Sequence, residues 1–220
     1  MKIVYPNFNY TIDFENQNCF ILTIENSKLF YDFCKDIFIQ YNGETGDTII
    51  FDDEKFTMEK NSILFYDYFN IENNTTKIIN LINKTITSEL NNGDYIKEIS
   101  EINSLIVKLN QKLIEEIDLP IIYSDDFSIE KFVKLSNYSV AKNNKILEDI
   151  LTSIEILINI KKVKLIIFIN IFSILSEDEI YDLIKDLKYK DIKILFVNSY
   201  EKYKILDVEK IIIDDDLCVI

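Results

Sequence analysis

Two continuous apolar runs of strand length stand near the C-terminus, VKLIIFIN at 163–170 and IKILFVN at 192–198. Such runs are typical of strands that are buried on both faces of a parallel sheet. Between them, Ser176 and Glu179 match a capping box, which predicts a helix that begins just after Ser176. A strand, a helix and a strand joined by short connections predict a βαβ unit.

The N-terminal part carries a second set of β/α signals. Short β-rich runs occupy 2–5, 19–24 and 48–51, and residues 27–40 place apolar side chains at helical spacing. Two glycines within 42–47 predict a turn. Both ends of the chain therefore favour the same α/β fold class.

The middle of the chain differs, because it carries three long apolar stripes at helical spacing, within 78–90, 99–113 and 147–158. Stripes that are nearly free of glycine and proline favour helices that pack on one another rather than on a sheet. The sequence therefore predicts an α/β head domain made of residues 1–70 and 161–220, with an α-helical insertion, or leg domain, at residues 71–160.

Composition removes several mechanisms. The 220 residues include no histidine and no arginine, so Ser-His-Asp and Cys-His catalytic units and imidazole zinc ligands are excluded, and phosphate contacts fall to lysine. The formal charge of −14 favours solubility and argues against nucleic acid. No stretch is apolar enough to span a membrane, so a soluble, cytoplasmic protein is expected. Cys19, Cys34 and Cys218 are predicted to be buried thiols in a reducing compartment.

No loop that could cradle phosphate is recognisable. The paired glycines, Gly43 and Gly46, stand three positions apart and are followed by Asp47, whereas a Walker A loop has four residues between its glycines and then a lysine. The turn after 163–170 contains no glycine. Nucleotide hydrolysis is therefore not predicted.

An acidic cluster around Pro120 is the strongest candidate for a metal site. Six carboxylates fall within residues 115–130, and this oxygen-rich composition without histidine or thiol suits a hard cation, calcium above magnesium. The alternative is structural: Asp125 or Asp126 caps the helix that begins near Phe127, and the glutamates form a solvated face. The other acidic runs, 52–54 and 214–216, are interpreted as solvated.

Lysines gather in three places, at 131 and 134, at 142 and 145, and at 161, 162 and 164. Lys131 and Lys134 share a helical face directly after the acidic cluster. If cations neutralise the neighbouring carboxylates, this surface changes from repelling phosphate to accepting it, which would couple calcium and nucleic acid as ligands.

Residues 163–203 and the tail 211–220 carry a family likeness, together with residues 61–82 and the Glu-Ile-Asp-Leu stretch at 116–119. In segment order, spacing and length the chain resembles the CRISPR-associated adaptation protein of type II-A loci, the Csn-two family, in its short form. The resemblance implies a P-loop-NTPase-like α/β head with a parallel-rich sheet that lacks the Walker loop, plus an inserted α-helical leg.

The resemblance also implies a function without catalysis. Family members assemble as homotetrameric rings, bind Ca²⁺ where head and leg meet, and take double-stranded DNA ends through a lysine-lined hole during spacer acquisition in antiviral defence. They act with the CRISPR adaptation integrase and the effector nuclease. Carried over to this chain, the expected calcium ligands are Glu116, Asp118, Asp125, Asp126 and Glu130, and the expected DNA-binding residues are Lys131, Lys134, Lys142 and Lys145.

Two other classes of function remain open from the sequence. The same carboxylates could hold two cations and make the protein a metal-dependent nuclease. Alternatively, the protein is an interaction module whose negative charge simply repels DNA.

Overall fold

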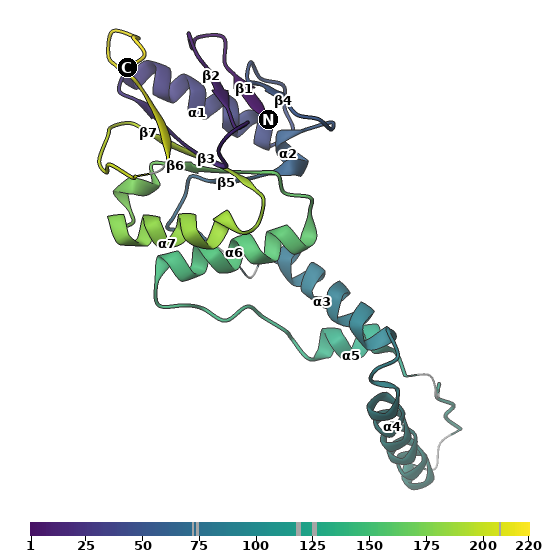
Figure 1. Cartoon of the computed structure of the whole chain (residues 1–220). Coiled ribbons are helices and arrows are strands. Elements are labelled where there is room, and N and C mark those ends of the chain that lie inside the picture. Colours follow the sequence, from purple (N-terminus) through teal and green to yellow (C-terminus); the bar gives the residue numbers. More distant parts are fainter. Residues whose placement is uncertain (72, 74, 118–119, 125–126, 207) are drawn as a thin grey trace. The chain divides into compact units, whose positions relative to one another are not determined.

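The computed structural model describes residues 1–71, 73, 75–117, 120–124, 127–206 and 208–220. The chain divides into two compact units. Unit 1 consists of Met1–Ile71 and Lys142–Ile220, and unit 2 of Glu72–Ala141. Unit 1 contains the strands and is mixed α/β, whereas the described part of unit 2 is helical (Figure 1).

The main sheet of unit 1 has five parallel strands in the order β5-β6-β7-β3-β8. They are β3 (Cys19–Ile24), β5 (Ser62–Phe65), β6 (Leu165–Ile169), β7 (Lys193–Asn198) and β8 (Glu209–Ile213). All residues of β3 and β5 are buried, as expected for strands covered on both faces. The predicted α/β fold class with a parallel-rich sheet is thereby confirmed, and the strand arrangement is compatible with a P-loop-like head.

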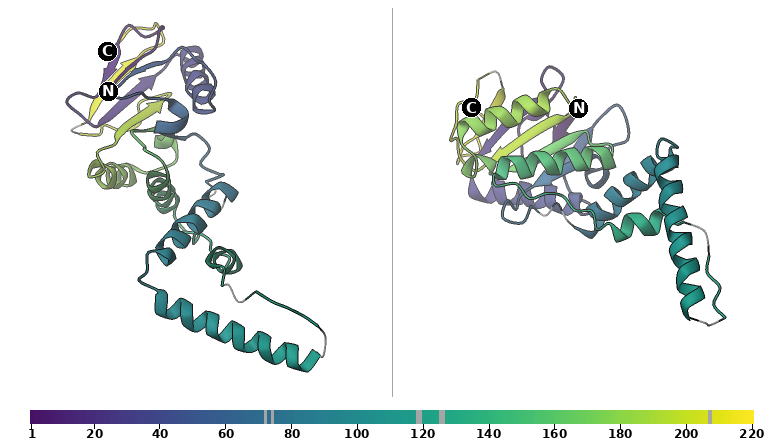
Figure 2. Two further views of the ribbon diagram at one scale, coloured as in Figure 1. Left: turned by 90° about the vertical axis from the view of Figure 1, so that its right-hand side faces the viewer. Right: turned by 90° about the horizontal axis from the view of Figure 1, so that it is seen from below.

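Two helical layers cover this sheet. Because successive strand residues point to opposite faces, Leu195 and Val197 of β7 enter one apolar core and Ile194 and Phe196 the other. Helix α1 (Ser27–Tyr41) packs on the first face, and α6 (Ile146–Ile160) and α7 (Glu177–Lys188) lie side by side on the second (Figures 1 and 2).

The predicted βαβ unit is confirmed as β6, α7 and β7, with β6 and β7 paired in parallel. Ser176 is the N-cap of α7: its Oγ accepts from the Glu179 N–H at 3.4 Å, while the Glu179 carboxylate accepts from the Ser176 N–H at 2.8 Å. These two bonds complete the capping box. A short 3₁₀ turn, η1 (Ile171–Ser173), links β6 to this helix.

A small antiparallel sheet of order β2-β1-β4 completes unit 1 on the α1 side. It contains β1 (Lys2–Val4), β2 (Thr11–Asp13) and β4 (Ile49–Phe51), and a short helix, α2 (Met58–Asn61), leads from it into β5. Strand β2 and helix α2 were not predicted, because elements of three or four residues show no clear period; β1 and β4 are as short, but they lie within the β-rich runs 2–5 and 48–51.

The third predicted apolar stripe forms α6, but this helix belongs to unit 1 rather than to the helical insertion. Ile150 and Ile154 are fully buried in the same core as Ile166 and Phe168 of β6. The structure therefore places the end of the insertion before α6, and not at residue 160. Amphipathic spacing shows that a helix has an apolar face but not which surface covers that face.

Unit 2 contains α3 (Thr76–Asn91), α4 (Ile96–Ile117) and α5 (Ile129–Leu135), and α5 packs against α3. Helix α4 has no buried residue, and Leu105 and Leu109 are more than half exposed.

The three cysteines are free, with Cys19 buried, Cys34 half-buried and Cys218 exposed. Burial raises the pKa of the Cys19 and Cys34 thiols to about 12. The prediction of buried thiols is therefore wrong for Cys218, which lies in the C-terminal turn. No helix among the described residues combines the length and apolar character needed to cross a bilayer.

Candidate functional site

The predicted calcium ligands flank the connection between α4 and α5. Glu116 lies in the last turn of α4 and Glu130 in the first turn of α5, and both side chains are exposed. Asp118, Asp125 and Asp126 lie outside the described residues. Among the residues that the structure does describe, no three carboxylate or thiol groups come together as a metal centre would require.

Helix α5 carries the first pair of predicted DNA-binding lysines. It begins after Ser128, whose Oγ accepts from the Lys131 N–H at 3.3 Å. Val133 is fully buried, while Lys131 and Lys134 are exposed. The buried valine determines which face of this short helix is turned inward, so the two ammonium groups lie at the surface of unit 2.

The second pair, Lys142 and Lys145, lies in unit 1, in the segment that leads into α6, and both residues are exposed. Lys145 stands at the N-cap position of α6, and its positive charge attracts the carboxylate of Glu179 in the capping box of α7. The pKa of Glu179 is lowered mainly by hydrogen bonds from Ser176, with the charge of Lys145 as a smaller contribution. The four predicted lysines are thus two pairs on two units.

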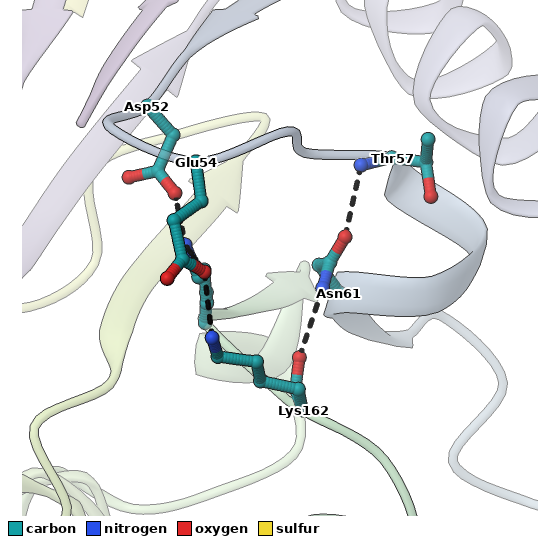
Figure 3. A network of polar contacts seen from close by, with 6 residues as sticks. Asp52, Glu54, Thr57, Asn61 and Lys162 are labelled. Atoms are coloured by element: carbon teal, nitrogen blue, oxygen red, sulfur yellow. Dashed lines mark hydrogen bonds and ion pairs between the residues drawn. The ribbon is translucent and has the colours of Figure 1, made fainter.

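Lys162 and Lys164 already form ion pairs with acidic side chains, and Figure 3 shows the pairing of Lys162 with Glu54. Lys162 Nζ lies 2.6 Å from Glu54 Oε2, and Lys164 Nζ bridges Glu54 at 3.2 Å and Asp52. Hydrogen bonds from Lys162 and then Lys164 lower the pKa of Glu54, and the bond to Asp52 raises the pKa of Lys164. The interpretation of 52–54 as a solvated run is therefore wrong for Asp52, whereas Glu54 is ion-paired but remains exposed.

The side chain of Asn61 makes hydrogen bonds to both segments of the same region, one before α2 and one before β6. Its Oδ1 accepts from the Thr57 N–H at 3.0 Å, and its Nδ2 donates to the Lys162 carbonyl at 3.1 Å (Figure 3). The sequence did contain a signal for this cluster, since an acidic run precedes β5 and a basic run precedes β6. Adjacent parallel strands begin at the same edge, so two such runs can meet there.

Gly46 makes room for a buried carboxylate instead of a phosphate, whereas Gly43 adopts a positive φ of 87° in the same turn. Asp36 on α1 accepts from the Asp47 N–H at 2.6 Å, from the Thr48 N–H at 2.9 Å and from the Gln40 amide at 2.9 Å. A Cβ at Gly46 would collide with Asp36 and Gln40. The turn thus closes over an internal anion.

At the carboxyl edge of the parallel sheet, where open α/β proteins commonly bind ligands, internal hydrogen bonds engage several of the polar groups. Asn170, in the left-handed region, accepts through Oδ1 from the Ser199 N–H at 2.9 Å. Only two residues connect β3 to α1, and Asn26 caps that helix while donating to the Asp215 carbonyl at 3.0 Å. This connection is too short to wrap around a nucleotide phosphate.

These features define an α/β protein with an inserted helical unit, exposed lysine pairs and no glycine-rich phosphate loop in the described residues. A family model described as CRISPR-associated protein (Cas_Csn2) matches residues 40–217, which is most of the chain. The chain therefore belongs to this CRISPR-associated family, and the resemblance found in the sequence is confirmed.

Proposed function

We propose that the protein binds the ends of double-stranded DNA in a calcium-dependent manner, as a homotetrameric ring, during CRISPR spacer acquisition. It performs no chemistry in this role. The observation that carries the proposal is the family match over residues 40–217, which assigns a CRISPR-associated role. The adaptation integrase and the effector nuclease of the same system are its expected protein partners.

The exposed lysine pairs support the DNA part of the proposal. In the described part of the chain, Lys131, Lys134, Lys142 and Lys145 form no salt bridge, unlike Lys162 and Lys164. Lysine contacts phosphate as a point charge, and phosphate contacts position a protein on DNA without reading its sequence. The expected binding is therefore independent of sequence and weakens steeply with salt.

Bound calcium would offset the negative charge that otherwise keeps an acidic protein away from DNA. Glu116 and Glu130 stand at the helix ends that flank residues 118–126, and carboxylate oxygens are the ligands that calcium prefers. A bound cation next to Lys131 and Lys134 would remove the repulsion between these carboxylates and a phosphate backbone.

The first experiment measures assembly and binding on the same samples. Native mass spectrometry in calcium and in chelator reports the oligomer, and mobility shifts compare a linear duplex with a closed circle of the same sequence. We expect a tetramer that binds only the linear form, with affinity lost in chelator. Equal affinity for the two forms would contradict end binding, and chelator-resistant binding would remove calcium from the function.

The second experiment tests the lysines with a charge-matched control. Lys131→Glu combined with Lys134→Glu should weaken binding and reduce the slope of log affinity against log salt by about 0.9 for each phosphate that is no longer neutralised. The control pair, Lys185→Glu and Lys188→Glu, has the same three-residue spacing on α7 and should leave binding nearly unchanged. Equally weakened binding in both variants would assign the effect to net charge alone.

A third measurement addresses catalysis. Labelled duplex incubated with magnesium or manganese should remain intact. Cleavage that depends on the protein and disappears in Asp125→Ala would instead establish a metal-dependent nuclease.

A further inference from the structure

Helices α6 and α7 are the most acidic pair of neighbouring helices in unit 1. The two helices carry eight carboxylates against two lysines, a net charge of −6 out of −14 for the whole chain. A phosphate backbone is repelled by such a surface. The layer therefore favours a positively charged ligand over DNA, and such a ligand does not depend on the proposed DNA binding.

Between these helices lies a hollow of about 510 Å³. Three apolar residues from the two helices border it, of which Ile154 and Leu187 are fully buried and Leu151 is half-buried. Three exposed carboxylates line the same hollow, on Glu148, Glu155 and Asp186. The hollow therefore combines the accessible part of the Leu151 side chain with an acidic rim.

Hydrogen bonds hold one side of this rim in place. The Asn143 amide donates to Asp149 Oδ1 and to Thr152 Oγ1, both at 3.2 Å. Lys190 offers only partial neutralisation, because its Nζ lies 3.7 Å from Glu155 Oε1. No ion pair among the described residues engages Glu148 or Asp186, so their charges are available to a ligand.

We propose that this hollow is a docking site for a basic segment of a partner protein, which inserts an arginine or lysine side chain. Long basic side chains lay their aliphatic stems along apolar surface while the charged head stays at the rim. The Leu151 side accommodates the stem, and the three carboxylates accept charge-assisted hydrogen bonds from the head. Charge complementarity selects a basic protein segment.

The test uses a fluorescein-labelled helical peptide of alanine and glutamine that carries three arginines spaced four residues apart. The same peptide with citrulline at those positions is the uncharged control. Fluorescence anisotropy with the full-length protein should give saturable binding of the arginine peptide, and the citrulline peptide should bind at least about tenfold more weakly.

Variants locate the binding. The combination Glu148→Gln, Glu155→Gln and Asp186→Asn should weaken the complex about tenfold, as expected when three exposed ion pairs are removed. The combination Asp53→Asn, Asp215→Asn and Asp216→Asn removes the same charge from exposed positions outside the layer, and it should change affinity less than twofold. All six side chains are exposed, and unchanged thermal midpoints verify the fold.

A third variant tests shape separately from charge. Thr152→Phe fills the hollow without changing the net charge, so it should weaken binding. If Thr152→Phe lowers the thermal midpoint of the protein, the smaller substitution Thr152→Met is used in its place. Absence of saturable binding to the wild type, equal weakening in the two triple variants, or full affinity in the filled variant would overturn the proposal.

Discussion

The buried carboxylate of Asp36 gives the sharpest prediction about stability. Its side chain is 6% exposed and accepts four hydrogen bonds, three of which tie α1 to the turn before β4, while the fourth comes from Gln40 on the same helix. In Asp36→Ala, the Gln40 amide and the Asp47 N–H can turn toward water, because those residues are not buried. Thr48 is 5% exposed, so its N–H and hydroxyl would remain buried without an acceptor.

Each unsatisfied buried donor costs about 1–3 kcal/mol, so the two groups of Thr48 predict a decrease of about 2–6 kcal/mol in the free energy of unfolding. The control is Asp32→Ala, one helical turn earlier, where the half-buried side chain accepts none of these hydrogen bonds and a change within about 0.5 kcal/mol is expected. Urea unfolding followed by far-UV circular dichroism gives both values.

Hydrogen exchange at the Thr48 amide supplies a local readout, and exchange there should accelerate in Asp36→Ala but not in Asp32→Ala. A decrease below about 1 kcal/mol with unchanged protection at Thr48 would refute the reasoning, since two buried donors cannot lose their acceptor so cheaply.

Two further predictions concern local electrostatics. Ser176→Ala removes one half of the capping box of α7 and should lower the free energy of unfolding by about 1 kcal/mol in urea, whereas Ser176→Asp should retain most of it. The depressed pKa of Glu54 means that its pairing with Lys162 stabilises the fold fully above the unfolded carboxyl pKa near 4.5, and that this stabilisation is lost as pH falls through the folded value. The difference in urea midpoint between wild type and Glu54→Gln should therefore shrink from about pH 6 to pH 3, and a constant difference would show that the pair contributes nothing that depends on ionisation.

Some parts of the site were visible in the sequence and some were not. The apolar runs of β6 and β7 and the cap at Ser176 are local patterns, and each became the predicted element. The pairing of Asp52 with Lys164 spans more than 100 residues, and no local pattern determines which of several acidic and basic runs will meet. The glycines at 43 and 46 were correctly assigned to a turn, but the reason for Gly46, the carboxylate of Asp36, lies on another element.

The sequence by itself determined the fold class, the family and the absence of histidine and arginine chemistry, because these depend on residue types, short-range periodicity and segment order. Only the tertiary structure decided that α6 packs on the sheet, that two of the clustered lysines are neutralised, and that α6 and α7 enclose an acidic hollow. The physical reason is that an apolar stripe or a charge is satisfied by whichever surface the chain brings to it, and that choice is made by long-range packing.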